Sequence, residues 1–362
     1  MNKKITIIFP FTGDSFGGSH VSIINMIKNL DKNRFKAIIF LHKDGVLKKN
    51  LIKENIDFIV DKSLKVFQDN GFINFFFYSL HNVFKIKKTL REYNVDIIHV
   101  NDGIMQTVWS IPTLLCKRKF IWHIRSRDDS RRLIIYSFFA NQILAVSQFC
   151  KKNIPFPFGN KVKVINNFFK APKSFYPFTK KSFNIAYVAN YKLQKRPELF
   201  FQIINEIFIM KKNINLKFYI FGKLKLSQKK KLINKIISKK YFKNVYFKGH
   251  QYPIDPWLNR SHISVSLGEN EGFGRVIVES MLNKTLVLAI KGGGHDEIIA
   301  HKKNGILIDS DNPKIFAKNL IYYLENLKLF KKLTDEAYKF SKKKYIDDNP
   351  IKLITKIYNE LV

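Results

Sequence analysis

The sequence contains little cysteine, and this scarcity excludes two kinds of protein. Cys116 and Cys150 are the only cysteines among the 362 residues, and no C-x-x-C pair occurs. Disulfide-stapled domains and cysteine-ligated zinc sites both need more cysteines at closer spacing. We therefore expect a protein of a reduced, cytoplasmic setting whose fold depends on hydrophobic cores and not on disulfides or metal.

Long hydrophobic runs are also missing. A membrane-spanning helix needs about 18 or more apolar residues in succession. The nearest candidate, residues 72–84, is interrupted by Asn74, His81 and Asn82. The start of the chain carries two lysines before a short apolar run, as a signal peptide does, but no small-residue cleavage site follows. We predict a first β-strand there and no membrane span.

Acidic residues are scarce relative to basic ones. The chain has 64 Lys and Arg against 28 Asp and Glu, a formal net charge of +36, and the excess is spread over both halves. Such a charge favours a polyanionic partner or an anionic surface, although a general bias toward Lys, Asn, Ile and Phe explains it equally well. The sequence has no recognisable nucleic-acid-binding motif, so we expect no nucleic-acid partner.

One aromatic stretch has a basic end. Residues 72–84 are rich in Phe, and Lys85, Lys87, Lys88 and Arg91 follow them. A helix with an apolar face and a basic end can lie in a membrane interface. It can equally pack on a sheet as a core helix with a solvated basic end, and the sequence leaves both interpretations open.

Short β-type runs alternate with helical periodicity along the chain. The predicted strands of the first half are residues 5–10, 36–41, 57–60, 96–100, 119–124, 142–146 and 162–165. Those of the second half are residues 183–189, 216–221, 245–247, 263–266, 286–290 and 306–308. This alternation predicts an α/β fold with parallel sheets, whose functional residues lie at the carboxyl ends of the strands. The aperiodic, proline-containing residues 168–181 predict a linker between two Rossmann-like domains.

Several polar or small residues follow predicted strands. Gly17 and Gly18 stand between the first strand and a predicted helix over 19–30, an order that places helix N–H groups against phosphates. A plain strand-to-helix turn is the alternative, since neither G-x-G-x-x-G nor a Walker A string occurs. His123 stands at the end of another strand, and Asn101 and Asp102 are candidates for contact with an acceptor.

The most informative string is E-G-F-G-R-V-I-V-E, residues 271–279. Its glycines allow close backbone approach to a ligand, and its apolar end predicts a helix over 276–282. If the string were helical throughout, the two carboxylates would lie about 12 Å apart along the axis. A paired acid and base in glycoside chemistry needs about 5–9.5 Å. The spacing therefore predicts two contacts on one long polar ligand, with two solvated surface glutamates as the alternative.

This string resembles the E-x7-E signature of retaining glycosyltransferases of the GT-B fold, family 4 (group 1). Phe273-Gly274-Arg275 lies between the glutamates, and K-G-G-G-H-D-E, residues 291–297, follows at the expected distance. The resemblance implies an acceptor-side domain of residues 1–168, a donor domain of residues 169–345 and an active site in the cleft between them. It also implies that a C-terminal helix, residues 346–362, packs back onto the first domain.

The resemblance implies roles for individual residues. Glu271 would meet the transferred sugar, Glu279 would hold the ribose hydroxyls, and His123 would lie beside the sugar. Lys195 would neutralise the donor diphosphate, but Asn190 replaces the arginine that the family pairs with it. An amide supplies no charge, which Lys192 or Arg196 could restore. The implied donor-binding residues are Gly17, Gly18, Asn190, Lys195, Gly272, Phe273, Gly274, Glu279, Gly293 and Glu297.

We therefore predict a retaining hexosyltransferase that uses no metal or other cofactor. It would move a sugar from a UDP- or GDP-linked donor to a hydroxyl of a saccharide acceptor. The expected acceptor is a lipid-linked intermediate of envelope polysaccharide or lipopolysaccharide synthesis, met at the anionic inner face of the membrane. A GT-B sugar-nucleotide epimerase and a basic nucleic-acid-binding protein are the alternatives.

Overall fold

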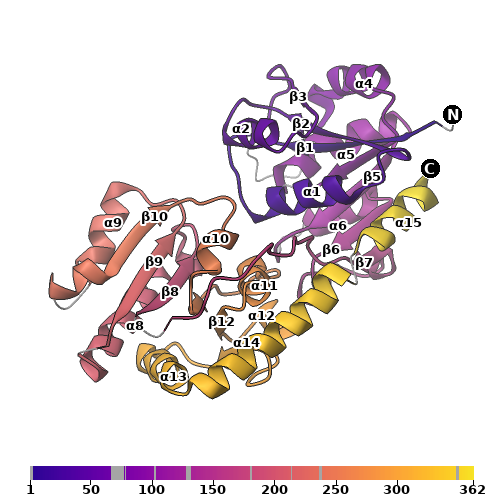
Figure 1. The fold of residues 1–362 in the computed structure, drawn as a ribbon. Coiled ribbons are helices and arrows are strands. Elements are labelled where there is room, and N and C mark those ends of the chain that lie inside the picture. Colours follow the sequence, from indigo (N-terminus) through magenta and orange to yellow (C-terminus); the bar gives the residue numbers. More distant parts are fainter. Residues whose placement is uncertain are drawn as a thin grey trace. The chain divides into compact units, whose positions relative to one another are not determined.

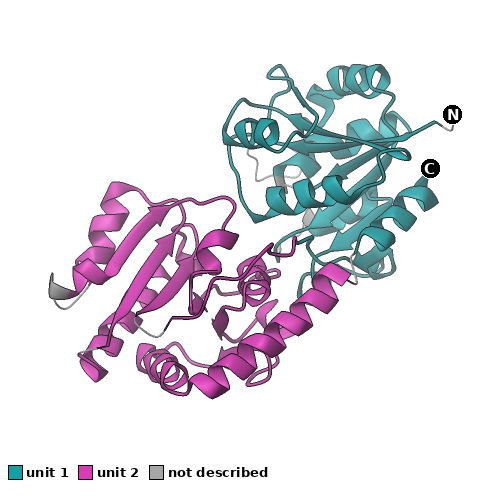
Figure 2. Ribbon diagram, in the orientation of Figure 1, with its two compact units in different colours: residues 1–169, 349–362 teal, residues 170–348 magenta. Residues whose placement is uncertain are grey.

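The structure, a computed structural model, divides into two compact units (Figure 2). Unit 1 comprises residues 1–169 and 349–362, and unit 2 comprises residues 170–348. Each contains a parallel β-sheet flanked by helices (Figure 1). The residues that the structure describes are 3–66, 77, 79–101, 103–127, 132–179, 182–212, 214–235, 239–347 and 350–362.

The sheet of unit 1 has the strand order β3-β2-β1-β4-β5-β6-β7. Its strands are β1 (Ile5–Phe11), β2 (Phe35–Leu41), β3 (Phe58–Val60), β4 (Ile97–Val100), β5 (Lys119–Ile124), β6 (Gln142–Ala145) and β7 (Val162–Val164). Nearly every residue of β1, β4 and β5 is buried, as expected for strands covered on both faces. The order reverses between β1 and β4, which places the ends of these two strands at a switch point.

The helices of unit 1 connect these strands, and the last one comes from the end of the chain. They are α1 (Gly18–Asn29), α2 (Val46–Lys53), α4 (Val83–Glu92), α5 (Gly103–Leu115), α6 (Arg132–Phe139), α7 (Gln148–Lys151), the 3₁₀ helix η1 (Phe158–Lys161) and α15 (Ile351–Leu361). Tyr358 of α15 is fully buried, and its hydroxyl lies 2.7 Å from Nδ1 of His99 on β4. The C-terminal helix is therefore part of the core of unit 1.

The sheet of unit 2 has the order β10-β9-β8-β11-β12-β13, with a reversal between β8 and β11. Its strands are β8 (Phe183–Val188), β9 (Leu216–Phe221), β10 (Val245–Gly249), β11 (Ile263–Ser266), β12 (Leu286–Ile290) and β13 (Ile306–Ile308). Its α-helices are α8 (Pro197–Met210), α9 (Leu226–Ile233), α10 (Asp255–Leu258), α11 (Arg275–Leu282), α12 (His295–Ile298), α13 (Pro313–Glu325) and α14 (Leu327–Lys342). Shorter turns are η2 (Leu193–Lys195), η3 (Lys239–Asn244) and the π-helical η4 (Lys343–Asp347).

The strands predicted from the sequence are all confirmed, with ends that differ by at most two residues. The predicted helix over 276–282 begins one residue earlier, at Arg275, because Gly274 adopts a left-handed conformation (φ 90°) that stops helical backbone from extending further back. The aromatic stretch over 72–84 lies partly outside the described residues, and α4 takes up its basic end. Within the described ranges, no helix is long and apolar enough to cross a bilayer.

Candidate active site

The candidate site of unit 2 lies where the strand order reverses, at the carboxyl ends of β8 and β11. The loop after β8 ends in η2, and the loop after β11 is the glycine-rich string that enters α11. The backbone N–H of Glu269 donates to the carbonyl of Gln194 at 2.8 Å, which joins the two loops. Ligands of open α/β sheets bind in the crevice outside such a reversal.

Lys195 and Glu271 form an ion pair across these two loops. The Lys195 ammonium donates to Oε1 of Glu271, and the side chains are 33% and 19% exposed. The buried hydroxyl of Tyr187, on β8, donates to the Lys195 carbonyl at 2.5 Å. Burial, followed by the nearby Glu271 charge, raises the pKa of Tyr187, so this donor keeps its proton. The fold thus brings Lys195, which is predicted to meet the diphosphate, into direct contact with Glu271, which is predicted to meet the sugar.

The glycine turn at residues 292–294 packs directly against the acidic loop. The N–H of Gly294 donates to the carbonyl of Glu271 at 2.8 Å. A Cβ on Gly294 would lie 2.6 Å from Cα of Phe273. A Cβ on Gly293 would lie 2.8 Å from the backbone carbonyl oxygen of Glu271. These are backbone atoms that cannot move aside cheaply, so side chains are excluded from both positions.

His295 was not assigned a role from the sequence, although it stands inside the G-G-G-H-D-E string. It is fully buried, and its Nδ1–H donates to the carbonyl of Ile290 at 2.8 Å, because a carbonyl only accepts. Its Nε2 is then left to accept from the Ser266 hydroxyl at 3.3 Å. Burial lowers the pKa of His295, so the ring stays neutral and joins the ends of β11 and β12 behind the acidic loop.

Glu279 lies one turn into α11, and its carboxylate is partly engaged. Nε and Nη2 of Arg275 donate to its Oε1 at 3.1 and 2.7 Å. Burial raises the pKa of Glu279, and the neighbouring Arg275 partly offsets this. Among the described residues its Oε2 has no ion-pair or hydrogen-bond partner, because both contacts with Arg275 are made by Oε1.

Asn190, which stands where the family has an arginine, makes a contact that holds two loops together. Oδ1 of Asn190 accepts from the backbone N–H of Lys223 at 2.9 Å, so this amide joins the loops after β8 and β9. Arg196 forms ion pairs with Glu269 and Asp311. Lys192 is exposed and has no ion pair within the described part of the chain. Of the two candidates for the missing charge, Lys192 is the one not already held by carboxylates.

Other residues predicted at this site contribute through their backbone or lie to one side. The ring of Phe273 is only 5% exposed and packs edge-on against Tyr345, so a ligand could meet only its backbone. The Glu297 charge contributes, after burial, to raising the pKa of Tyr345. Asp309 and Asp311 form a D-x-D string, and their carboxylates pair with Lys291 and Arg196.

A second group of polar residues lies at the carboxyl edge of the sheet in unit 1. The Gly17 N–H at the start of α1 donates to Nδ1 of His20, which is buried. Burial and the Arg125 charge lower the pKa of His20 to about 4. Gly18 is the first residue of the helix. The predicted glycine turn therefore carries a neutral, buried imidazole that the sequence analysis did not identify.

His123 is almost completely buried at the end of β5. Its Nδ1 shares a hydrogen bond of 3.1 Å with Nε2 of His99, and the two rings are stacked. Nδ1 of His99 in turn forms a hydrogen bond with the Tyr358 hydroxyl, so a buried chain of hydrogen bonds runs from β5 to the C-terminal helix. Burial, then the Arg125 charge, holds the pKa values of both histidines well below their usual range. His123 is therefore neutral and does not carry a charge.

Arg125 and three polar partners lie beside these histidines. Its Nε and Nη2 donate to Oδ1 of Asn101 at 3.0 and 2.7 Å, and its Nη1 donates to Oδ1 of Asn167 at 2.7 Å. Ser22 of α1 donates to the same Asn167 oxygen at 2.8 Å. Asn101 is therefore occupied in holding Arg125, while Asp102, the other predicted acceptor contact, lies outside the described residues.

Comparisons with known proteins cover nearly the whole chain. The family model "Glycosyltransferase Family 4" matches residues 16–170, and "Glycosyl transferases group 1" matches residues 170–340. An uncharacterised glycosyltransferase of Methanocaldococcus jannaschii is 24% identical, with 98% of this chain and 97% of the relative aligned. A poly(ribitol-phosphate) alpha-N-acetylglucosaminyltransferase of Staphylococcus aureus is 31% identical over 52% of this chain and 36% of its own length. The structure of Anabaena HepE, in complex with UDP and glucose, superposes with a TM-score of 0.81 at 20% identity, covering 98% of this chain and 99% of HepE.

Two Rossmann-like units with these matches define a GT-B glycosyltransferase. The chain belongs to the group 1, family 4 glycosyltransferases, whose two models together span residues 16–340.

The tight contact at Gly294 generates a prediction. Gly294→Ala should lower the free energy of unfolding by about 1–3 kcal/mol, because the added methyl group overlaps backbone atoms of the acidic loop. Denaturant titration measures the change. Gly159→Ala is the control, since a Cβ there meets no atom within 4 Å, and it should change stability by less than about 0.5 kcal/mol. Equal stability of the two variants would show that the glycine turn does not constrain the loop.

Proposed function

We propose that the protein is a retaining glycosyltransferase that moves a sugar from a UDP- or GDP-linked donor to a hydroxyl of a saccharide acceptor. The observation that carries this proposal is the Lys195–Glu271 pair, held against the glycine turn at the switch point of unit 2. A cation for the diphosphate and a carboxylate for the sugar hydroxyls lie side by side. UDP and glucose in the similar HepE structure support the same class of donor.

In the proposed reaction, the bond between the anomeric carbon and the diphosphate oxygen breaks. The bond to the acceptor oxygen forms on the same face of the sugar, and the acceptor proton passes to the departing diphosphate oxygen. Lys195 and backbone N–H groups stabilise the developing negative charge. Glu271 orients the sugar without attacking it, and His123, which is neutral, takes no proton in this route. This route needs no metal or other cofactor, so a chelator should leave the rate unchanged.

The acceptor in this proposal is a lipid-linked saccharide of envelope polysaccharide or lipopolysaccharide synthesis. The name of the S. aureus relative describes transfer to poly(ribitol-phosphate), a polymer whose ribitol units carry hydroxyls, which supports a hydroxyl acceptor on a polymer. An epimerase would use the same donor but has no acceptor, so incubation with donor alone separates it from a transferase. The family membership does not favour either that alternative or nucleic-acid binding.

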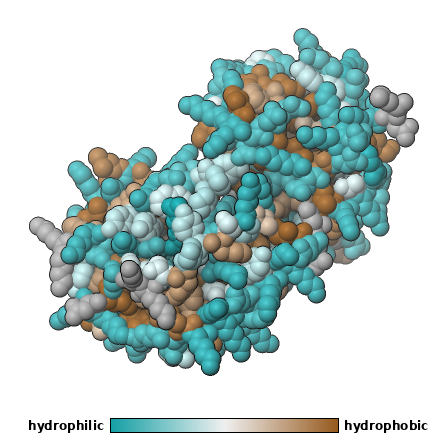
Figure 3. All heavy atoms as spheres, in the orientation of Figure 1, coloured by the Kyte–Doolittle hydropathy of each residue, from teal (hydrophilic) through white to brown (hydrophobic). Residues whose placement is uncertain are grey.

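Exposed apolar side chains on neighbouring helices support action at the cytoplasmic face of a membrane. Helices α4, α5 and α6 are packed in sequence, α4 on α5 and α5 on α6. They carry an apolar face made of Phe84, Leu114, Leu115, Ile134 and Phe138, all of them more than half exposed. Hydrophobic atoms gather at the end of unit 1 that carries α4 (Figure 3). Lys85, Lys87, Lys88 and Arg91 beside this face could bind anionic lipid headgroups.

The anomeric configuration of the product tests the reaction. With an α-linked nucleotide sugar, the product should be α-linked, because leaving group and acceptor use one face of the sugar. Proton NMR of freshly formed product measures the anomeric coupling. The alpha linkage in the name of the S. aureus relative is in line with this outcome. A β-linked product would refute the retaining mechanism.

Donor affinity should depend on the charge of Glu279. The ionised carboxylate accepts from ribose hydroxyls, and burial raises its pKa above 4.5, so UDP affinity should fall as the pH is lowered, starting above that value. Glu279→Gln should weaken UDP binding about tenfold at neutral pH. It should also remove the fall in affinity at low pH, the acid limb of the profile. Calorimetry across pH measures both effects. Glu336→Gln, at an exposed position on α14, should change neither, and an acid limb retained in Glu279→Gln would assign the titration to another group.

Membrane association should depend on the apolar face. Phe84→Ser removes a ring that is 85% exposed and should weaken binding to vesicles containing phosphatidylglycerol about tenfold. High salt should release the wild-type protein, because the Debye screening length falls to about 3 Å at an ionic strength of 1 M. Phe156→Ser, at a position 96% exposed elsewhere in unit 1, is the matched control. Equal loss in both variants, or equal binding to neutral vesicles, would contradict the assignment.

A further inference from the structure

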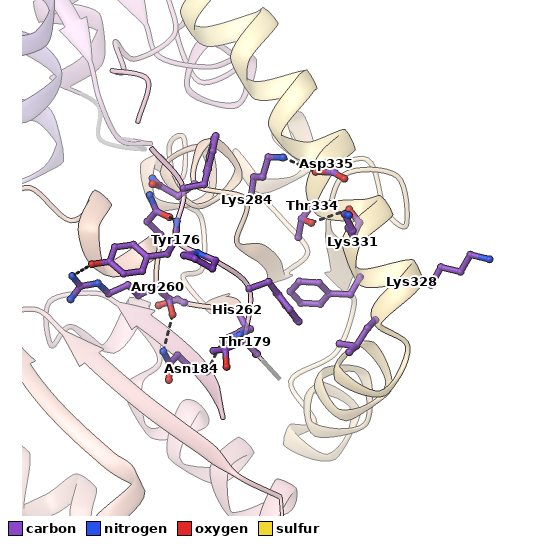
Figure 4. Close-up of a pocket in the computed structure, with 18 residues that line it drawn as sticks. Tyr176, Thr179, Asn184, Arg260, His262, Lys284, Lys328, Lys331, Thr334 and Asp335 are labelled. Carbon is purple, nitrogen blue, oxygen red and sulfur yellow. Dashed lines mark hydrogen bonds and ion pairs between the residues drawn. The ribbon is translucent and has the colours of Figure 1, made fainter. Parts of the chain in front are cut away.

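A cavity of about 600 Å³ lies in unit 2, away from the Lys195–Glu271 pair (Figure 4). His262 lines it and directly precedes β11, whereas Glu271 follows the other end of that strand. The cavity therefore opens at the amino edge of the sheet and the candidate active site at the carboxyl edge. Its volume falls within the range of about 300–1,000 Å³ that small-molecule sites occupy.

Aromatic side chains form much of its wall. Phe175 and Phe178, from the segment that precedes β8, are 41% and 49% exposed, and Phe330 of α14 is buried behind them. Tyr176, between the two phenylalanines, is 51% exposed. Rings that line a cavity while remaining half in water provide apolar area that a ligand can bury.

Most polar groups of the wall are occupied in holding the segment over residues 174–179 in place. The Asn259 amide donates to the Ser174 carbonyl and accepts from the Tyr176 N–H at 2.7 Å. His262 accepts from the Asn184 N–H at Nδ1 and donates to the Thr179 carbonyl from Nε2, both at 2.9 Å. Few donors and acceptors are left to read the many hydroxyls of a saccharide. The buried Oδ1 of Asn283 has no partner in the part of the chain described.

The ring geometry disfavours a flat ligand. Phe178 meets His262 at 75° and Phe330 at 56°, and Phe175 meets Tyr338 at 90°. A planar heterocycle is held best between parallel faces, in offset stacks. Rings tilted in several directions instead surround a flexible chain.

The basic side chains of the wall outnumber its single carboxylate. Lys284 pairs with Asp335 at 2.8 Å and lies 5.2 Å from the Phe175 ring centroid, and Arg260 lies over the Tyr176 ring. Lys331 has no ion pair within the described residues, while Lys328 points away from the cavity (Figure 4). The mouth of the cavity is therefore positively charged and suits an anionic group.

We propose that this cavity binds a single-chain amphipathic anion. Its aliphatic chain lies among Phe175, Phe178 and Phe330, and its phosphate or carboxylate head lies at Lys331 and Lys284. This site is separate from donor binding and does not rest on the proposed reaction.

Binding of decyl phosphate below its micelle concentration tests the proposal. Calorimetry on the full chain should show one site, and excess UDP should not displace the ligand. Phe178→Ala should weaken binding about tenfold through lost apolar contact, and Lys331→Glu should weaken it by a similar factor. Lys332→Glu, the neighbouring exposed lysine outside the cavity wall, should change it less than twofold. Unchanged thermal unfolding of each variant excludes a folding defect.

Two further arms identify the source of the ligand and the role of its head. Decanol, which lacks the charge, should bind at least about tenfold more weakly than decyl phosphate. If vesicles containing phosphatidic acid also bind in a manner sensitive to Phe178→Ala, the cavity takes its chain from a bilayer. If only monomeric decyl phosphate does, the ligand is a free amphiphile. No binding of decyl phosphate, or binding that Phe178→Ala and Lys331→Glu leave unchanged, would overturn the proposal.

Discussion

The ion pair between Lys195 and Glu271 is the interaction on which the candidate donor site depends. It joins the loops that follow β8 and β11, as the Glu269–Gln194 hydrogen bond also does. The Gly294–Glu271 hydrogen bond joins the loop after β11 to the glycine turn after β12. In this structure, the lysine proposed to bind the diphosphate is neutralised by the carboxylate proposed to orient the sugar. A diphosphate must therefore compete with Glu271 for Lys195. When it does, the carboxylate becomes available to accept from sugar hydroxyls, so recognition of the two parts of the donor is coupled in one exchange of partners.

In unit 1, burial keeps three imidazoles neutral and a nearby positive charge adds to the effect. Burial, followed by the Arg125 charge, lowers the pKa of His20, His99 and His123. A neutral His123 fits a proposed mechanism in which the leaving diphosphate, and not a side chain, takes the acceptor proton. The hydrogen-bonded chain from His123 through His99 to Tyr358 also makes the orientation of that ring depend on the C-terminal helix.

The sequence predicted the strands and the entry into α11 because these depend on local patterns of apolar residues and glycines. The signature string predicted which residues belong to the candidate site, but not what those residues contact. The pairing of Lys195 with Glu271 joins residues 76 positions apart, and the His99–His123 contact depends on the register of β4 against β5. His295 has no periodicity or spacing that distinguishes a buried bridge from a ligand contact. Likewise, nothing local shows that Phe273 is turned into the core or that Asn190 fastens a neighbouring loop.

The affinity of Glu271→Gln for UDP tests the central claim most directly, with Lys195→Met measured beside it. If Glu271 competes for Lys195, removing its charge frees the lysine, and UDP should bind as tightly as to the wild type or more tightly while sugar transfer is lost. Lys195→Met should weaken UDP binding about tenfold or more. Loss of UDP affinity in Glu271→Gln equal to that in Lys195→Met would contradict the exchange of partners on which this account rests.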